Sequence, residues 1–284
     1  MDPTVSPSMK RVRPCGFAPT ARATVTGALA CALVCMCFSA AAGAAQSAKL
    51  GASLSPERLG HSTTIGFSLQ IASTGGGVPS PVTGVDLLYP PGLGLAQSGL
   101  GVETCSEATL QIIGAGGCPP DSRMGFGSAL SEIQFGPEIV IEPASVEIVR
   151  GPQQGGHLSL LFYAEGVYPV KAQTVFSGSL QPATAPFGRS IDISIPLVES
   201  LPGAPDVATA RLHATIGPLH LTYYEQVNHR TVAYEPTGIV LPTRCPRGGF
   251  RFAAELGFAD GSHASATTAV ACPRAKAKRS GRRS

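Results

Sequence analysis

The chain has 284 residues with a formal net charge of +3, and it contains 34 glycines and 25 prolines. Its charge is uneven: residues 46–273 carry eleven basic and seventeen acidic side chains, whereas residues 274–284 carry six basic ones and no acid. The acidic body disfavours nucleic-acid binding, because nucleic acids attract basic surfaces.

The first 45 residues have the pattern of a secretory signal peptide. Basic residues, among them Lys10, Arg11 and Arg13, precede an apolar run over residues 25–38 that ends in the small residues SAAAGAAQ. That order is typical of export signals, and the run is shorter than the ~20 residues that span a bilayer. We expect cleavage after position 44 or 45, with an uncleaved anchor as the alternative. The protein is therefore expected to be secreted or held on the extracellular face of the cell envelope.

The remaining chain, about 239 residues, alternates apolar and polar side chains with a period of two. This pattern covers residues 65–71, 158–162, 191–197 and 208–216, and it is typical of half-buried antiparallel strands. We expect an all-β antiparallel β-sandwich, or two packed sandwich-like modules over residues 46–135 and 136–273. A short helix is expected at TCSEATLQ, where Thr104 and Glu107 match a capping box.

The last part of the body predicts a β-hairpin. Apolar residues share one face over residues 250–258 and again over residues 264–270. A three-residue loop over residues 259–261, with Gly261 in the left-handed conformation, would pair Leu256 with Ala264 and Phe250 with Val270. Cys245 and Cys272 would then meet at the base of this hairpin.

Four cysteines remain after the signal segment: Cys105, Cys118, Cys245 and Cys272. Export makes the oxidised state the default, and four cysteines allow three pairings. We expect the local pairs 105–118 and 245–272, because they close the smallest loops. A metal site is disfavoured by the lack of any C-x-x-C knuckle, and a reactive thiol by the lack of basic neighbours around the first pair. A disulfide closing the first loop would stabilise it by about 3 kcal/mol, and we would look for a partner on its surface.

Linear catalytic motifs are missing: there is no G-x-S-x-G, H-E-x-x-H or phosphate-binding glycine loop. The six histidines never form an i, i+2 or i, i+4 pair; they are His61, His157, His213, His220, His229 and His263. His213 is expected to face solvent. The glutamates at 138, 142 and 147 are interpreted as the solvent-exposed face of a strand pair, not as the paired catalytic carboxylates of a glycosidase. We therefore expect a non-enzymatic protein without metal or cofactor.

Sugar binding stays open as an alternative, because β-sandwiches bind glycans through exposed aromatic rings. The chain has no tryptophan, and Tyr223 and Tyr224 are adjacent on an expected strand, so one of them must point outward. These two tyrosines are the candidate ligand contacts. A further alternative is an extracellular hydrolase whose residues are brought together only by folding.

Several motifs resemble a recurrent group of uncharacterised secreted proteins from GC-rich Gram-positive bacteria. They are PPGLG at residues 90–94, TCSEA at 104–108, GCPPDSRMGFGSA at 117–129, and LPTRCPRGGFRFAAELGFADGS followed by ACP. The resemblance implies export and an all-β fold. It implies no activity and no site residues.

The leading hypothesis is an interaction or structural module at the cell envelope, whose partner is an unknown protein or an envelope polymer. Membrane association is expected only through an uncleaved signal or the basic tail over residues 274–284, which is expected to be disordered. The candidate envelope contacts in this tail are Lys276, Lys278, Arg279, Arg282 and Arg283.

Deletion of residues 274–284 tests the role of the tail. If its cations bind anionic envelope polymers or lipids, the truncated protein shifts from the envelope fraction to the medium when cells are fractionated. Unchanged partitioning would show that the tail anchors nothing.

Overall fold

The structure is a computed structural model that describes residues 45–168, 171–200 and 202–273. Its strands in chain order are β1 (Gln46–Ser55), β2 (Ser62–Ser73), β3 (Val82–Tyr89), β4 (Arg123–Phe135), β5 (Glu138–Arg150), β6 (Ser159–Gly166), β7 (Ala172–Pro182), β8 (Arg189–Ser194), β9 (Ala208–Ile216), β10 (Tyr223–Val227), β11 (Arg230–Tyr234), β12 (Ile239–Val240), β13 (Phe250–Phe258) and β14 (His263–Val270). One α-helix, α1 (Glu107–Ile113), and three 3₁₀ turns, η1 (Leu95–Gln97), η2 (Ala115–Gly117) and η3 (Pro120–Ser122), lie between β3 and β4.

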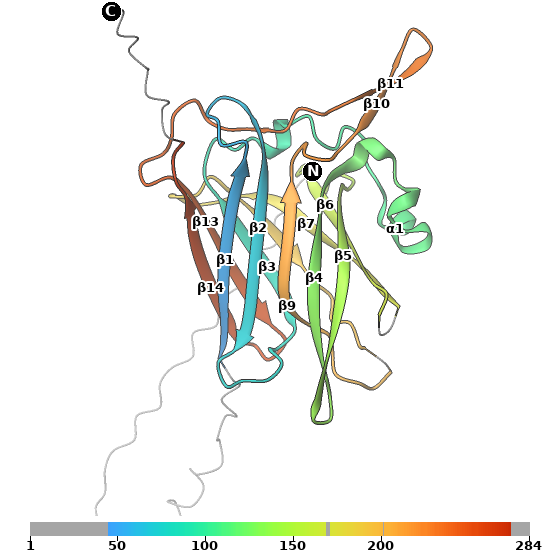
Figure 1. Ribbon diagram of the computed structural model, residues 1–284, viewed down its shortest axis with the longest axis vertical. Helices are drawn as coiled ribbons and strands as arrows, with labels where there is room; N and C mark the ends of the chain where they lie inside the picture. The colour runs from blue at the N-terminus through green and yellow to red at the C-terminus, as the bar shows by residue number, and fades with distance from the viewer. Residues whose placement is uncertain (1–44, 169–170, 201, 274–284) are drawn as a thin grey trace, which may run out of the picture. The chain divides into compact units, whose positions relative to one another are not determined.

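Most strands belong to one large antiparallel sheet with the order β1-β2-β9-β4-β5-β6-β7-β8-β3-β13-β14, and β12 pairs with β2. The sheet curls so that β14 returns beside β1, which gives a nearly closed barrel shape (Figure 1). The expectation of an all-β antiparallel fold is confirmed, whereas a sandwich of two sheets is not. At residues 135–138, where we expected a module boundary, the structure has the turn of the β4–β5 hairpin, and the sheet continues through it.

The C-terminal hairpin has the register that the apolar pattern predicts. Phe250 pairs with Val270 and Leu256 with Ala264, and Gly261 has a φ of 77°. This register places Phe250, Phe252 and Leu256 in the interior. A disulfide joins Cys245 to Cys272 at the base of the hairpin, as expected.

Large side chains fill the upper end of the interior, the end at which β1 finishes and β13 begins. Phe250, Phe252, Met124, Leu160 and Tyr223 are all fully buried there and belong to one apolar cluster. A smaller cluster around Leu256 and Phe258 packs the lower end, near β2, β3 and β13. The upper end of the core is thus well filled, whereas the lower end is filled only beside β2, β3 and β13.

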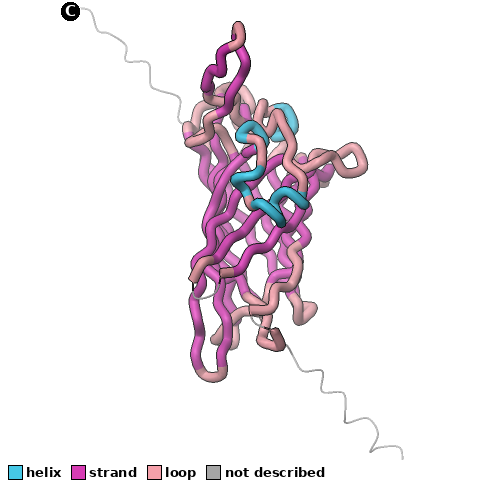
Figure 2. Tube along the Cα trace, turned by 90° about the vertical axis from the view of Figure 1, so that its right-hand side faces the viewer, coloured by secondary structure: helices cyan, strands magenta, loops and turns pink. Residues whose placement is uncertain are grey.

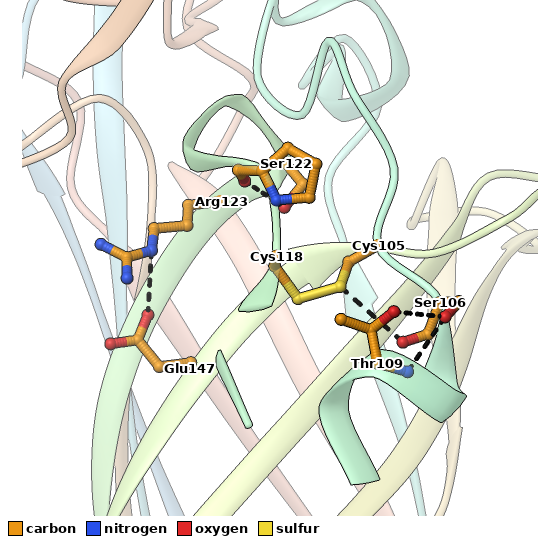
Figure 3. Close-up of a disulfide and its surroundings, with 8 residues drawn as sticks. Cys105, Ser106, Thr109, Cys118, Ser122, Arg123 and Glu147 are labelled. Atoms are coloured by element: carbon orange, nitrogen blue, oxygen red, sulfur yellow. Dashed lines mark hydrogen bonds and ion pairs between the residues drawn. A yellow bond between two sulfur atoms is a disulfide. The ribbon is translucent and has the colours of Figure 1, made fainter. Parts of the chain in front are cut away.

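Between β3 and β4, the part of the chain from Cys105 to Cys118, with α1 and η2, packs on the outer face of β5 and β6 (Figure 2). Leu95 of η1 belongs instead to the apolar cluster of the interior. Leu110 of α1 is fully buried against Val149, Leu161 and Tyr163. The expected disulfide between Cys105 and Cys118 closes this segment (Figure 3). It packs in the same cluster and so ties the start of α1 to the sheet.

The expected capping box at Thr104 and Glu107 is wrong by two residues. Ser106 is the N-cap of α1, and its hydroxyl oxygen accepts a hydrogen bond from the backbone N–H of Thr109 at 3.0 Å (Figure 3). Glu107 is the first helical residue, where its negative charge interacts favourably with the positive end of the helix dipole.

No helix in the described ranges is long and apolar enough to cross a membrane. The expected signal segment, apart from Ala45, and the basic tail with its five candidate envelope contacts lie outside the described residues. The two disulfides are compatible with an oxidising, extracellular compartment.

Replacement of Gly127 by alanine tests how closely β4 and β9 approach. A Cβ atom at Gly127 would lie 2.2 Å from the carbonyl oxygen of His213, so the substitution must push the two strands apart. We expect Gly127→Ala to lower the free energy of unfolding by about 1–3 kcal/mol or more in urea titrations. Gly116→Ala is the matched control, because no atom lies within 4 Å of a Cβ there. Equal stability of the two variants would contradict the close approach.

Candidate functional site: an apolar interior cavity

An interior cavity of about 200 Å³ lies inside the curled sheet. Its wall is almost wholly apolar and includes Leu69, Val85, Val146, Phe162, Phe176, Ile193 and Leu212. These residues come from β2, β3, β5, β6, β7, β8 and β9, so folding of nearly the whole sheet is needed to form it.

Small residues on β4, β5 and β6 leave the space open. Ala129, Ala144, Ala164 and Gly166 all line the cavity. Ala129 pairs directly with Ala144, and Ala144 pairs with Gly166, so three neighbouring strands present small side chains at one level. Because successive residues alternate between faces, larger apolar residues at these positions would fill the space.

The cavity reaches the surface at the lower end of the sheet. Leu197, between β8 and β9, lines it and is 49% exposed. Other apolar side chains are exposed at the same end of the strands: Phe135, Ile139 and Ile141 of the β4–β5 hairpin, and Val167 and Tyr168 after β6. Apolar surface is therefore exposed at the end of the sheet where the cavity opens.

Glu142 is the one titratable side chain among the described residues that line the cavity. It is only 5% exposed, and its Oε1 atom has no hydrogen-bond partner. Burial raises the pKa of this carboxyl above its ordinary value, because a charge is poorly solvated among apolar side chains.

Two hydroxyl residues continue the polar row from Glu142 across the sheet. Ser131 of β4 is paired directly with Glu142 and with Thr209 of β9. Both hydroxyl residues line the cavity. The three strands therefore present a short row of polar side chains in an otherwise apolar wall.

The interpretation of Glu142 as a solvated strand residue is wrong. Its neighbours Ile139 and Ile141 are exposed, and Glu142 points inward with Val146 and Ile148. The sequence does indicate the inward direction of Glu142, because positions 142, 146 and 148 are separated by even numbers of residues and so fall on one face of a strand. Glu147 faces the opposite side and forms an ion pair with Arg123 at 4.0 Å (Figure 3), and Glu138 is exposed.

The two candidate tyrosines have different places. Tyr224 is 48% exposed on the β10–β11 hairpin, which projects from the upper end (Figure 1). Tyr223 is fully buried. Its hydroxyl accepts a hydrogen bond from the Gly101 N–H at 2.8 Å and donates one to the Arg123 carbonyl. Burial raises the pKa of Tyr223 to about 12. Tyr223 is therefore a core residue rather than a surface for a ligand.

The remaining candidates stay apart from the cavity. His213 is exposed, as expected, and the four cysteines form disulfides. Within the described ranges, no three His, Cys, Asp or Glu side chains gather in a way that could hold a metal ion. The disulfide-closed segment exposes Ile112 and Ile113 of α1, but nothing in the structure shows what covers them.

The pKa shift of Glu142 predicts how stability depends on pH. The folded protein binds the Glu142 proton more tightly than the unfolded chain, so this group's contribution is fully present below the ordinary pKa of 4.5 and is lost as the pH rises through the raised value. We expect the free energy of unfolding of Glu142→Gln, relative to the wild type, to increase as the pH rises through this window. Urea titrations between about pH 4 and pH 8 measure it, and Glu147→Gln is the control on the outer face. A difference that does not change with pH would contradict the assignment.

Comparisons with protein-family models, with curated proteins and with solved structures found no match to this chain.

Proposed function

We propose that the protein is an exported, non-enzymatic binding protein that holds a small apolar molecule, or the apolar chain of a larger one, inside its sheet. The supporting observation is the cavity of about 200 Å³ with its apolar wall. Apolar cavities of about 150 Å³ bind benzene or xenon rather than water. A cavity of this size therefore suits a slim apolar ligand.

The arrangement of the interior supports this proposal further. Large side chains pack the upper end densely, so the open space below is local. An unfilled cavity destabilises a protein, because the atoms that line it lose packing contacts. A ligand that fills the space restores these contacts, and burial of its apolar surface contributes about 25 cal/mol per Å².

The other hypotheses have weaker support. A glycan-binding surface would have to rely on Tyr224, since Tyr223 lies in the core. A hydrolase needs a second group to act with a carboxyl, and the described cavity wall offers only serine, threonine and glutamine side chains beside Glu142. Attachment to an envelope protein or polymer is compatible with ligand binding and remains part of the proposal.

Filling the cavity tests the binding function. Ala144 lines the cavity, whereas Ser145 on the same strand is exposed. We expect the wild type to bind benzene saturably, Ala144→Phe to weaken binding at least tenfold, and Ser145→Phe to leave it unchanged. Chemical shifts of cavity methyl groups report binding by NMR, and circular dichroism checks folding.

Ala164→Leu is a milder filling variant that covers the case in which Ala144→Phe fails to fold. The proposed function is wrong if neither benzene nor any linear six-carbon probe, such as 1-hexanol, binds the wild type saturably up to its solubility limit. It is also wrong if the exposed and the cavity substitutions weaken binding equally.

A further inference from the structure

Among the described residues that line the cavity, one fully buried side-chain oxygen lacks a hydrogen-bond partner. Glu142 Oε1 is buried and has no hydrogen-bond partner in the described part of the chain. The ion pairs found there use other carboxylates, namely Arg123 with Glu147 and Lys171 with Glu165. A buried acceptor without a partner costs about 1–3 kcal/mol, and more if it is charged, so its presence in an apolar wall calls for an explanation.

The sheet makes room for this carboxyl. A Cβ atom at Gly166 would lie 2.2 Å from Glu142 Oε1 and 2.9 Å from its Cδ, so any other residue there would collide with the carboxyl. Gly166 itself lines the cavity. The glycine on β6 and the glutamate on β5 therefore fit together, with the carboxyl at the cavity wall and not folded out to solvent.

Resting on the proposed function, we propose that Glu142 is the head-group site of the cavity: Oε1 accepts a hydrogen bond from the amine or hydroxyl end of an otherwise apolar ligand. Ser131 is paired with Glu142 in the sheet, Thr209 is paired with Ser131 one strand further on, and their hydroxyl groups extend the polar end of the site. The apolar chain lies among Val146, Phe162 and Leu212.

The chemistry of Glu142 selects the class of head group. A carboxyl oxygen without a partner needs a donor, which an amine or an alcohol supplies and an ether does not. Burial raises the pKa of the carboxyl, so a second anionic group beside it would be repelled or would force one of the two to take up a proton. An ammonium group instead offsets the negative charge and makes a charge-assisted hydrogen bond.

Four probes of similar length separate these head groups: hexylamine, 1-hexanol, pentyl methyl ether and hexanoate. We expect the wild type at neutral pH to bind the amine and the alcohol at least about tenfold more tightly than the ether, as a hydrogen bond to a charged or buried acceptor implies. Hexanoate should bind most weakly. Titration calorimetry, or NMR shifts of cavity methyl groups, gives the dissociation constants.

Two variants of Glu142 and a matched control locate the effect. In Glu142→Leu the preference for the amine and the alcohol over the ether should disappear, while the ether binds as well as in the wild type or better. Glu142→Gln keeps an acceptor oxygen but no charge, so it should lose affinity for the amine more than for the alcohol. Glu147→Leu, on the outer face of the same strand, should keep the wild-type preference.

A wild type that binds the ether as tightly as the amine and the alcohol would overturn the head-group site, and so would a preference that survives in Glu142→Leu. Either result still includes binding of at least one probe in the cavity and therefore leaves the cavity function standing. Failure of all four probes and of benzene to bind would overturn the cavity function, and the head-group site with it.

Discussion

Backbone hydrogen bonds join neighbouring antiparallel strands across the large sheet, from β1 at one edge to β14 at the other. This hydrogen-bonded ladder decides which side chains face the interior. Successive residues of a strand point to opposite faces, so a shift of one residue would exchange the lining of the cavity for the outer surface. The pairing of Ser131 with Glu142 and of Ala129 with Ala144 sets both the polar and the open part of the cavity. Every feature of the candidate site depends on that register.

The two ends of the sheet are built differently. Above, aromatic and long aliphatic side chains fill the interior, and the buried hydroxyl of Tyr223 connects the β10–β11 hairpin to Gly101 and Arg123. Below, alanine and glycine leave space, and the half-exposed Leu197 lies where the cavity reaches the surface. A densely packed half thus adjoins a half with open space, as the proposed binding site requires.

The disulfides act where the sheet supplies little stabilisation. Cys105 and Cys118 close a segment that holds the short helix α1 and the turn η2, and they pack with Leu110 against the outer face of β5 and β6. Cys245 and Cys272 join the base of the terminal hairpin, beyond the last pair of the β13–β14 ladder. Neither pair lines the cavity, so the cysteines form no part of the proposed binding site.

The sequence by itself determined the local features: the antiparallel strands, the left-handed Gly261, the register of the last hairpin and both disulfide pairs. Each of these depends on residues close together in the chain, through period-two alternation, turn chemistry or short loop closure. Only the tertiary structure decided that the sheet curls on itself instead of splitting into a sandwich, because the pairing of β2 with β9 and of β3 with β13 joins distant segments. Parity places Glu142 on the same face of β5 as Val146 and Ile148, but only the long-range pairing makes this face enclose a cavity, because the strands that line it are far apart in the sequence.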